Sequence, residues 1–368
     1  MMQKAVIVLP TYNEAKNVEE VLHSIFAQQS KLPSWELHVV VVDSASPDGT
    51  GPIVERLSQS TYPRLHLIKS KKEGLGKAYL TGFEIAIRDL SPDVLFEMDA
   101  DHSHDPAKIP EFLSEIDKGA DLVIGTRYSK GGSIPSDWGL DRKIYSIGAN
   151  IVIRLGFMRI KNTEWTNGYR AIKRSLIEKL MPHMSSYTGY VFQVAFLDKA
   201  INLGAKIAEV PIHFTDRIHG QSKINTPQYI LQTFAYVFTH SSFIRFVIVG
   251  VIGALVDFGT ASILKSMGAT ILIANGVSTE LAVVCNFLLN NYWSFAHNRI
   301  TKLSKLIPNF AKFNLVSLGN IVIQLVGISI GVLIGGERYW LIYKLITIVC
   351  VVIPYSYILY NKVIWKKK

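Results

Sequence analysis

Four apolar stretches, each long enough to cross a lipid bilayer, occupy the last third of the 368-residue chain. A helix of about 20 residues spans the hydrocarbon core of a membrane, and this requirement constrains the chain more than any other feature of its sequence. We therefore expect a four-helix transmembrane domain over residues 243–368, preceded by a domain at 1–225 and a juxtamembrane helix at 226–242. The expected spans cover residues 243–264, 271–293, 313–334 and 340–360.

Two of these stretches carry glycines about one helical turn apart, Gly250 and Gly253 in the first and Gly327 and Gly331 in the third. Small residues let membrane helices approach closely, so we expect these glycines to face neighbouring helices. The alternative is that the stretches are buried helices of a large soluble domain. Four such runs with so few acidic residues disfavour it.

The net charge of +10 belongs almost entirely to this apolar part of the chain. Residues 241–368 hold twelve Lys and Arg but three Asp and Glu, a net charge of +9, which leaves +1 for residues 1–240. A near-neutral domain followed by a basic, apolar one indicates a lipid bilayer as partner and disfavours nucleic acid, which requires a basic face interleaved with stacking aromatics. The basic residues cluster after the second and fourth stretches. By the positive-inside rule, we expect a multi-pass protein of the cell (inner) membrane with both termini and the first domain in the cytoplasm.

The first half of the chain alternates strand and helix patterns. Short β-branched, apolar runs predict strands at residues 4–9, 37–42, 65–68 and 94–98. Helical periodicity appears between them, at residues 17–28, 51–58 and 76–89. This alternation is typical of an open α/β sheet, a Rossmann-like architecture whose ligands bind at the carboxyl ends of the strands.

Two further segments, 143–157 and 227–238, are apolar and aromatic on one helical side but too short to span a bilayer. Such segments fit helices that lie along a membrane surface. Periodicity alone supports ordinary core helices equally well.

A pair of aspartates follows the fourth predicted strand directly, as Asp99-Ala100-Asp101. Two carboxylates separated by one residue in a turn can converge on a hard divalent cation, and Mg²⁺ or Mn²⁺ prefers such oxygen ligands together with substrate phosphates. His102 and His104 would also allow a zinc site. Because they alternate with carboxylates, Mg²⁺ or Mn²⁺, which prefer oxygen ligands, are favoured over zinc. The tripeptide alone also occurs in ordinary surface loops.

The loops after the first two strands carry polar residues, PTYNE at 10–14 and DSASPDGT at 43–50. Each motif alone is an ordinary turn or helix start. Because parallel strands bring their carboxyl ends to the same edge, together they favour a pocket for a nucleotide base and ribose. The loop at 74–77, GLGK, permits close approach of a ligand, although glycines at such junctions also serve purely structural needs.

Six motifs then occur in one order: PTYNE, VVVDSASPDGT, KKEGLGKA, MDADHSHDP, GTRY with a following GG, and WTNGYR. Together they resemble the GT-A-fold family-2 glycosyltransferases, and within these the polyprenyl-phosphate (dolichyl-phosphate) mannose synthases, over about residues 3–225. FVIVGVIGALVDF and NFLLNNYWSF make residues 243–365 similar to the GtrA-like membrane domain.

The resemblance implies roles for individual residues. The nucleotide-sugar site would comprise Pro10, Tyr12, Glu14, Asp43, Asp99, Ala100, Asp101, Arg217 and Lys223. The metal ligands would be Asp99, Asp101 and Ser103, the last standing where many relatives have Gln. The acceptor phosphate would be held by Arg127 and Arg142, which together with Asp101 form the catalytic set. Residues 166–170 would form the floor of the donor-sugar site. For Arg170, a purely structural role is the alternative.

The expected activity is that of an inverting β-D-mannosyltransferase that joins mannose from GDP-mannose to polyprenyl (dolichyl) phosphate. A phosphate acceptor is already ionised at neutral pH, so this reaction needs cations that hold two anions together and does not need a tuned base. UDP-glucose is the alternative donor. A different class of function, a lipid-linked sugar translocase, stays open because Asp257 and Glu280 lie within predicted spans, where helix packing is the other explanation.

Overall fold

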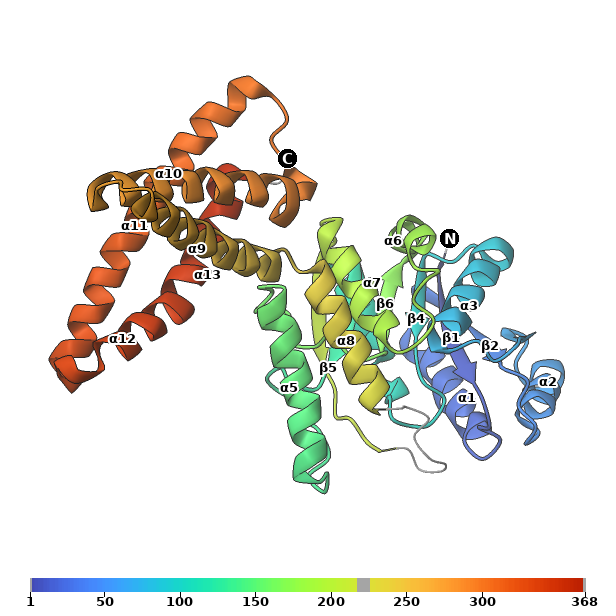
Figure 1. Cartoon of the computed structure of the whole chain (residues 1–368). Coiled ribbons are helices and arrows are strands. Elements are labelled where there is room, and N and C mark those ends of the chain that lie inside the picture. The colour runs from blue at the N-terminus through green and yellow to red at the C-terminus, as the bar shows by residue number, and fades with distance from the viewer. Residues whose placement is uncertain (1, 217–225, 367–368) are drawn as a thin grey trace. The chain divides into compact units, whose positions relative to one another are not determined.

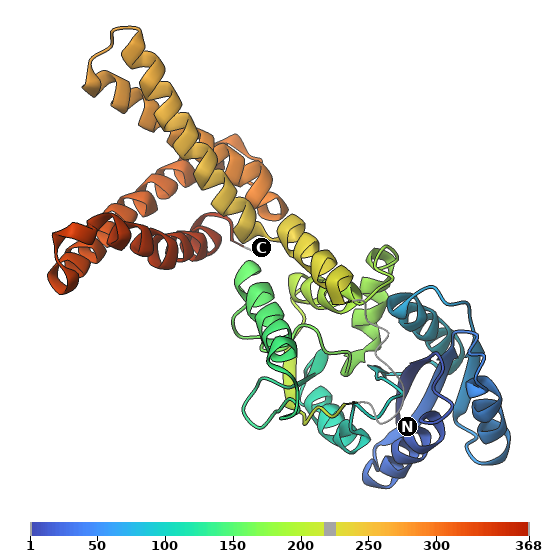
Figure 2. The same cartoon turned by 60° about the horizontal axis from the view of Figure 1, so that its bottom comes forward.

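The computed structural model describes residues 2–216 and 226–366, which divide into two compact units. The first unit is built from the chain up to Leu155 and from Arg159 to Val237, and the second from Gly156–Met158 and the chain from Phe238 onward. Figures 1 and 2 show a sheet with helices on both faces in the first unit and helices alone in the second.

The first unit contains a seven-stranded sheet with the order β3-β2-β1-β4-β6-β5-β7. Its strands are β1 (Gln3–Thr11), β2 (Trp35–Asp43), β3 (Leu65–Lys69), β4 (Val94–Glu97), β5 (Leu122–Thr126), β6 (Arg170–Lys173) and β7 (Ile207–Pro211). Strand β6 runs antiparallel to β4 and β5, and the other neighbours are parallel. The open α/β sheet expected from the sequence is confirmed, and its first four strands lie within two residues of the predicted bounds.

Helices cover both faces of this sheet. The helices between residues 2 and 240 are α1 (Val18–Phe26), α2 (Thr50–Ser60), α3 (Leu75–Leu90), α4 (Ile109–Asp117), α5 (Leu140–Gly156), α6 (Arg174–Leu180), α7 (Val191–Asn202) and α8 (Thr226–His240), with short 3-10 turns at Ala27–Lys31, Pro106–Lys108 and Met181–His183. Alternate residues of β1 pack against the helices on opposite faces of the sheet. Ile7 packs in one core with α1, α2 and α4, whereas Val8 lies against Gly82 of α3.

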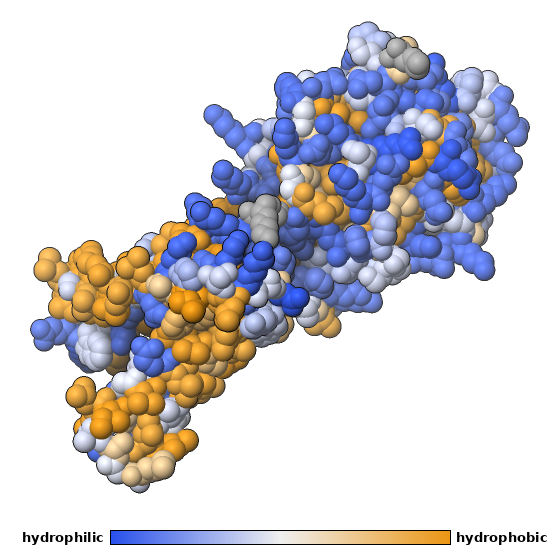
Figure 3. Space-filling view, turned by 90° about the horizontal axis from the view of Figure 1, so that it is seen from above, coloured by the Kyte–Doolittle hydropathy of each residue, from blue (hydrophilic) through white to orange (hydrophobic). Residues whose placement is uncertain are grey.

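The second unit is helical, and four of its helices are long and apolar enough to cross a membrane: Ser242–Ser266, Ile271–Ser294, Leu303–Gly335 and Glu337–Ile364. They comprise α9 (Ser242–Ser266), α10 (Ile271–Leu289), α11 (Leu303–Gly335), α12 (Trp340–Thr347) and α13 (Ile353–Leu359), with π turns at Asn290–Ser294, Ile348–Val352 and Tyr360–Ile364 and 3-10 turns at Ala296–Asn298 and Glu337–Tyr339. Hydrophobic residues dominate the surface of this unit, unlike that of the sheet unit (Figure 3).

The third of these helices begins ten residues before the predicted span at 313–334 and contains all of it. Lys305 and Lys312 interrupt the apolar run and made the sequence look like a loop. Both side chains are exposed on α11. Lysine is a good helix former, so a basic helical extension continues the span beyond its apolar part.

Three of the four predicted glycine contacts are confirmed. A Cβ at Gly253 would overlap the Asn286 amide of α10, one at Gly327 would overlap Thr347, and one at Gly331 would overlap Tyr343. The prediction is wrong for Gly250, because no described residue comes within 4 Å of its Cβ position.

Asp257 connects two of the spans. Its Oδ1 accepts a hydrogen bond from Ser278 Oγ of α10 at 2.6 Å. This agrees with the helix-packing explanation for the carboxylate.

Candidate functional site

The loops that leave β1, β2 and β4 meet at the carboxyl edge of the parallel strands. Each contains a non-glycine residue with a left-handed backbone: Asn13 (φ 57°), Ala45 (φ 55°) and His102 (φ 68°). Such conformations cost free energy and cluster at ligand-binding sites. The strain therefore marks the same edge that the sequence predicts as the site.

Hydrogen bonds join the first two of these loops. Asp43 is 4% exposed, and its carboxylate accepts hydrogen bonds from Thr11 Oγ1 at 3.0 Å and from the Ser46 backbone N–H at 3.1 Å. The Glu14 backbone N–H donates to Thr50 Oγ1 at 2.9 Å. The structure thus brings the PTYNE and DSASPDGT segments together as one rigid edge.

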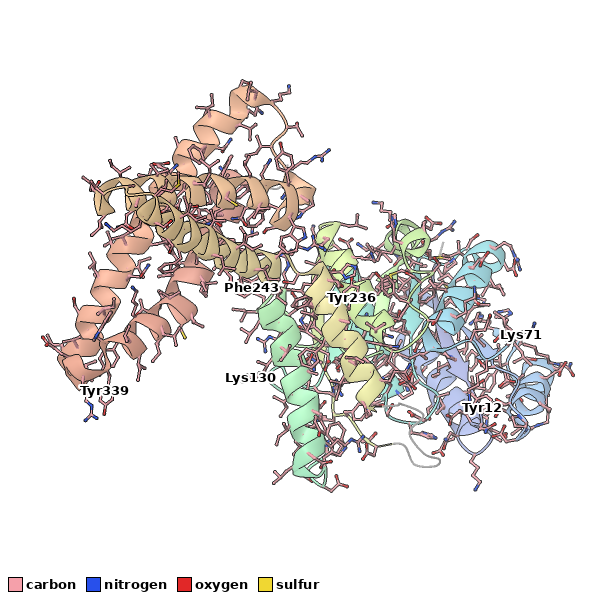
Figure 4. All side chains as sticks on the ribbon, viewed as in Figure 1. Tyr12, Lys71, Lys130, Tyr236, Phe243 and Tyr339 are labelled. Carbon is pink, nitrogen blue, oxygen red and sulfur yellow. The ribbon has the colours of Figure 1, made fainter. Side chains whose placement is uncertain are left out.

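Tyr12 lies beyond the end of β1, where Figure 4 labels it. The Lys72 ammonium lies 3.6 Å from the centre of the Tyr12 ring, a cation–π contact between the loops after β1 and β3. Pro10 pairs with Val42 inside the sheet. An aromatic face and a basic group at this edge suit a stacked base and a phosphate.

The two glycines of the GLGK loop have a structural reason. A Cβ at Gly74 would overlap the carbonyl oxygen of Thr188, and one at Gly76 the carbonyl oxygen of Tyr187. Close packing against the 187–188 backbone therefore accounts for both residues.

The paired aspartates lie in the loop after β4. The side chain of Asp99 is 39% exposed, while Asp101 is 5% exposed and accepts a hydrogen bond from the Ser103 backbone N–H at Oδ1 (3.1 Å). Ala100, between them, is buried. One open and one sheltered carboxylate, both at the strand edge, are the kind of oxygen ligands that Mg²⁺ or Mn²⁺ prefers, and a bound ion would take its other ligands from phosphate and water oxygens. Ligation by the Ser103 side chain stays a prediction.

Arg127, in the loop after β5, makes a buried ion pair. Its Nε and Nη2 donate to the two Glu164 oxygens at 2.8 and 2.9 Å, and Nη2 also donates to Thr166 Oγ1 at 2.8 Å. Burial opposes ionisation of both groups, yet the pairing holds the pKa of Glu164 below, and that of Arg127 above, the usual values. The guanidinium also lies over the Phe214 ring at 5.3 Å. Arg127 is thus fixed in place before any substrate arrives.

Arg142, in the first turn of α5, is half exposed. It forms two hydrogen bonds with Asp216, Nη1 to Oδ2 at 2.9 Å and Nη2 to Oδ1 at 2.7 Å. Its guanidinium lies 3.9 Å from the centre of the Trp138 ring, and Trp138 Nε1 also donates to Asp216 at 3.0 Å. Arg142 therefore presents two parallel N–H donors of the kind that bind a phosphate, and in this structure they bind the Asp216 carboxylate.

Arg170 is entirely buried and donates to the backbone oxygens of Trp165, Asn167 and Gln193. Its cross-strand partner is Glu97, 3.9 Å away. Burial raises the pKa of Glu97 to about 7, against the opposing charge of Arg170. This environment favours the structural role for Arg170.

The predicted site residues Arg217 and Lys223 lie outside the described residues. Sequence reasoning missed three polar partners that shape this edge, Trp138, Glu164 and Asp216, whereas Asn167 belongs to the predicted floor at residues 166–170. Glu164 directly precedes the WTNGYR segment, and Asp216 stands next to Arg217, so closeness in sequence to predicted site residues was the available signal for these two.

Comparisons with known proteins agree with this geometry. Residues 6–193 match the model of glycosyl transferase family 2, and residues 245–365 match that of the GtrA/DPMS transmembrane domain. The chain is 30% identical to a dolichol-phosphate mannosyltransferase of Pyrococcus furiosus over 94% of its own length and 95% of that protein.

Two bacterial relatives match the first part of the chain. A polyprenol monophosphomannose synthase of Mycolicibacterium smegmatis is 38% identical, covering 61% of this chain and 82% of that protein. An undecaprenyl-phosphate mannosyltransferase of Micrococcus luteus is 35% identical, covering 60% of this chain and 88% of that protein. The chain therefore belongs to glycosyl transferase family 2, among the polyprenyl-phosphate mannose synthases that carry a GtrA-type transmembrane domain.

Proposed function

We propose that this protein transfers mannose from GDP-mannose to a polyprenyl phosphate at the membrane surface, with inversion at the sugar carbon. One observation carries the proposal: the paired aspartates Asp99 and Asp101 and the two arginines, Arg127 and Arg142, belong to one folded unit, and the chain continues from it into four helices long and apolar enough to cross a membrane. A single segment, 213–216, contacts the loop of the aspartates and both arginines. Thr215 Oγ1 donates to the His102 carbonyl, Phe214 lies over Arg127, and Asp216 binds Arg142.

The donor site is assigned to the strand edge. The Tyr12 ring would stack on the base, and Asp43 would face the nucleoside from the neighbouring loop. Asp99 and Asp101 would hold the cation, which neutralises charge on the leaving diphosphate when it is bound. All three named relatives act with mannose, which favours GDP-mannose over UDP-glucose.

The acceptor phosphate is assigned to Arg127 and Arg142. An oxygen of this phosphate attacks C1 of the mannose, the bond from C1 to the diphosphate oxygen breaks, and its electron pair leaves with GDP. The acceptor is already an anion, so no side chain has to remove a proton. Attack from the face opposite the diphosphate turns the α-linked donor into a β-linked product.

The lipid part of the acceptor has a matching surface on α5. Ile144, Ile147, Ile151 and Leu155 repeat along one side of this helix and are 66, 41, 46 and 52% exposed. Between α5 and α8 lies a shallow apolar groove, lined by Val152, Ile153, Ile230, Phe234 and neighbours. We assign the exposed side to the membrane surface and the groove to the prenyl chain.

The other side of α5 is polar and contacts the site. Ser146 Oγ lies 2.6 Å from Tyr128 Oη, and Asn150 Oδ1 accepts from the Trp165 backbone N–H at 2.8 Å. A helix with one side toward Arg127's loop and the other toward lipid would deliver a membrane-bound phosphate to a cytosolic nucleotide sugar. This is the reason to place the sheet unit and both termini on the cytoplasmic side, as the basic loops predict.

The test is donor profiling of the full-length protein in detergent micelles containing undecaprenyl phosphate and Mn²⁺, with labelled GDP-mannose and UDP-glucose in parallel. We expect mannolipid from GDP-mannose with a β-anomeric linkage by NMR. Transfer from UDP-glucose but not from GDP-mannose would overturn the assignment of mannose and show that glucose is the sugar transferred. Failure to form any glycolipid, together with movement of preformed mannolipid across vesicles, would favour a translocase.

A further inference from the structure

A buried chain of hydrogen bonds connects the loop of the paired aspartates to the loop of Arg127. His104 is 1% exposed, and its Nδ1 lies 3.0 Å from the Asp99 backbone nitrogen. Its Nε2 lies 2.9 Å from Asn167 Oδ1. The Asn167 backbone N–H donates to Glu164 Oε1 at 3.2 Å, and Glu164 binds Arg127.

The direction of each bond follows from its partner. A backbone N–H can only donate, so His104 Nδ1 accepts and carries no proton. The proton of the neutral ring is then on Nε2, which donates to Asn167 Oδ1. Asn167 Nδ2 in turn donates to the Gly125 carbonyl at 2.6 Å, beside the Arg127 loop. His104 thus accepts from the Asp99 loop and donates to Asn167, while Glu164 accepts from both Asn167 and Arg127.

Packing leaves these side chains little freedom. The His104 ring stacks on Tyr169 with 4.9 Å between centres, and Tyr169 stacks on Phe112 at 4.4 Å. Asn167 is 4% exposed and Glu164 is fully buried. A shift of Asp99 is thus transmitted through rigid contacts to Glu164 and not absorbed by solvent.

We propose that His104 and Asn167 are positioning residues that, with Glu164, form a buried spacer and set the separation between the cation-binding loop and Arg127. The spacer rests on the proposed function. The spacer would matter for the geometry of the reaction. The acceptor phosphate and the donor diphosphate repel each other but must be held at reacting distance, and a small displacement lowers the reaction rate strongly.

Two substitutions of His104 separate its two hydrogen bonds. His104→Asn keeps an acceptor at the place of Nδ1 and loses the donor, whereas His104→Gln keeps a donor near the place of Nε2 and loses the acceptor. Both lose the ring that stacks on Tyr169, so each is the other's control for packing. The first readout is Mn²⁺ binding by electron paramagnetic resonance, with GDP or UDP present and no acceptor.

We expect His104→Gln to weaken nucleotide-dependent Mn²⁺ binding about tenfold and His104→Asn to keep it within about twofold, because only the former releases the Asp99 backbone. In steady-state assays, His104→Asn and Asn167→Ala should instead raise the KM for the lipid phosphate, since they cut the link toward Glu164. Equal losses in both His104 variants, or no loss in either, would overturn the spacer. Wild-type protein that binds no Mn²⁺ with either nucleotide would overturn the proposed function and the spacer with it.

Discussion

The Asp216 carboxylate holds the Arg142 guanidinium by two hydrogen bonds of 2.7 and 2.9 Å. In the proposed acceptor site, an incoming phosphate would bind these same two donors and would have to displace Asp216 from them. We expect Asp216→Asn to lower the KM for polyprenyl phosphate several-fold, because the neutral amide competes more weakly. Initial rates against lipid concentration at saturating donor measure this effect.

Trp138 provides the matched control. Trp138→Phe removes the indole N–H that binds Asp216 but keeps an aromatic ring beneath Arg142. This variant leaves the competing carboxylate in place, so its KM for the lipid should not fall. A fall in both variants would show that loosening the loop, not removing the charge, explains the result.

The Arg127–Glu164 pair makes a prediction about stability and pH. Glu164→Gln leaves Arg127 buried without a countercharge, a change that costs about 3–5 kcal/mol when a buried pair is broken from one side. The folded-state pKa of Glu164 is lowered, so its contribution is present above the usual glutamate pKa and is lost as the pH falls through the folded value. Thermal melts of both proteins should therefore converge in acid. A difference that persists unchanged at low pH would contradict the ion-pair explanation.

The membrane unit offers a pair of glycines for comparison. Gly253→Ala would force the Asn286 amide away from α9 and should destabilise the protein by about 1–3 kcal/mol, a typical cost of overpacking. Gly250→Ala meets no described residue and should be neutral or slightly stabilising, because alanine favours a helix. Melting temperatures in detergent measure both. A larger loss at Gly250 than at Gly253 would count against the packing of α9 on α10.

Asp101→Asn tests the paired aspartates as part of an enzyme. Removing one charge from the cation site should lower kcat by about 10²–10³-fold, in the range found for lost electrostatic stabilisation of a transition state. Chelation of divalent ions should abolish synthesis by the wild-type protein, and added Mn²⁺ should restore it. Asp105→Asn is a suitable control, since its Oδ1 accepts from the Ala107 backbone N–H at the start of a 3-10 turn.

The parts of the fold that follow from local periodicity could be predicted from the sequence. Strands such as β2 are continuous runs of valine with both faces buried, and this pattern appears directly in the chain. Strand β6 escaped prediction because Arg170–Lys173 is only four residues long and begins with a buried arginine. Its place in the sheet depends on Glu97 of β4, which is distant in sequence.

The site shows the same limit. Motifs indicated Asp99, Asp101, Arg127 and Arg142 as candidate site residues, but no motif indicates which distant residues contact each other. Asp216 reaches Arg142 across 74 positions of the chain, and Asn167 reaches His104 across 63. Such contacts are products of tertiary packing, which no local signal encodes.

The most direct measurement is a structure of the full-length protein with GDP and Mn²⁺, using the anomalous signal of the metal in crystals. We predict the ion between the Asp99 and Asp101 carboxylates and the diphosphate, with Tyr12 beside the base. An ion and diphosphate bound away from both aspartates would contradict this prediction.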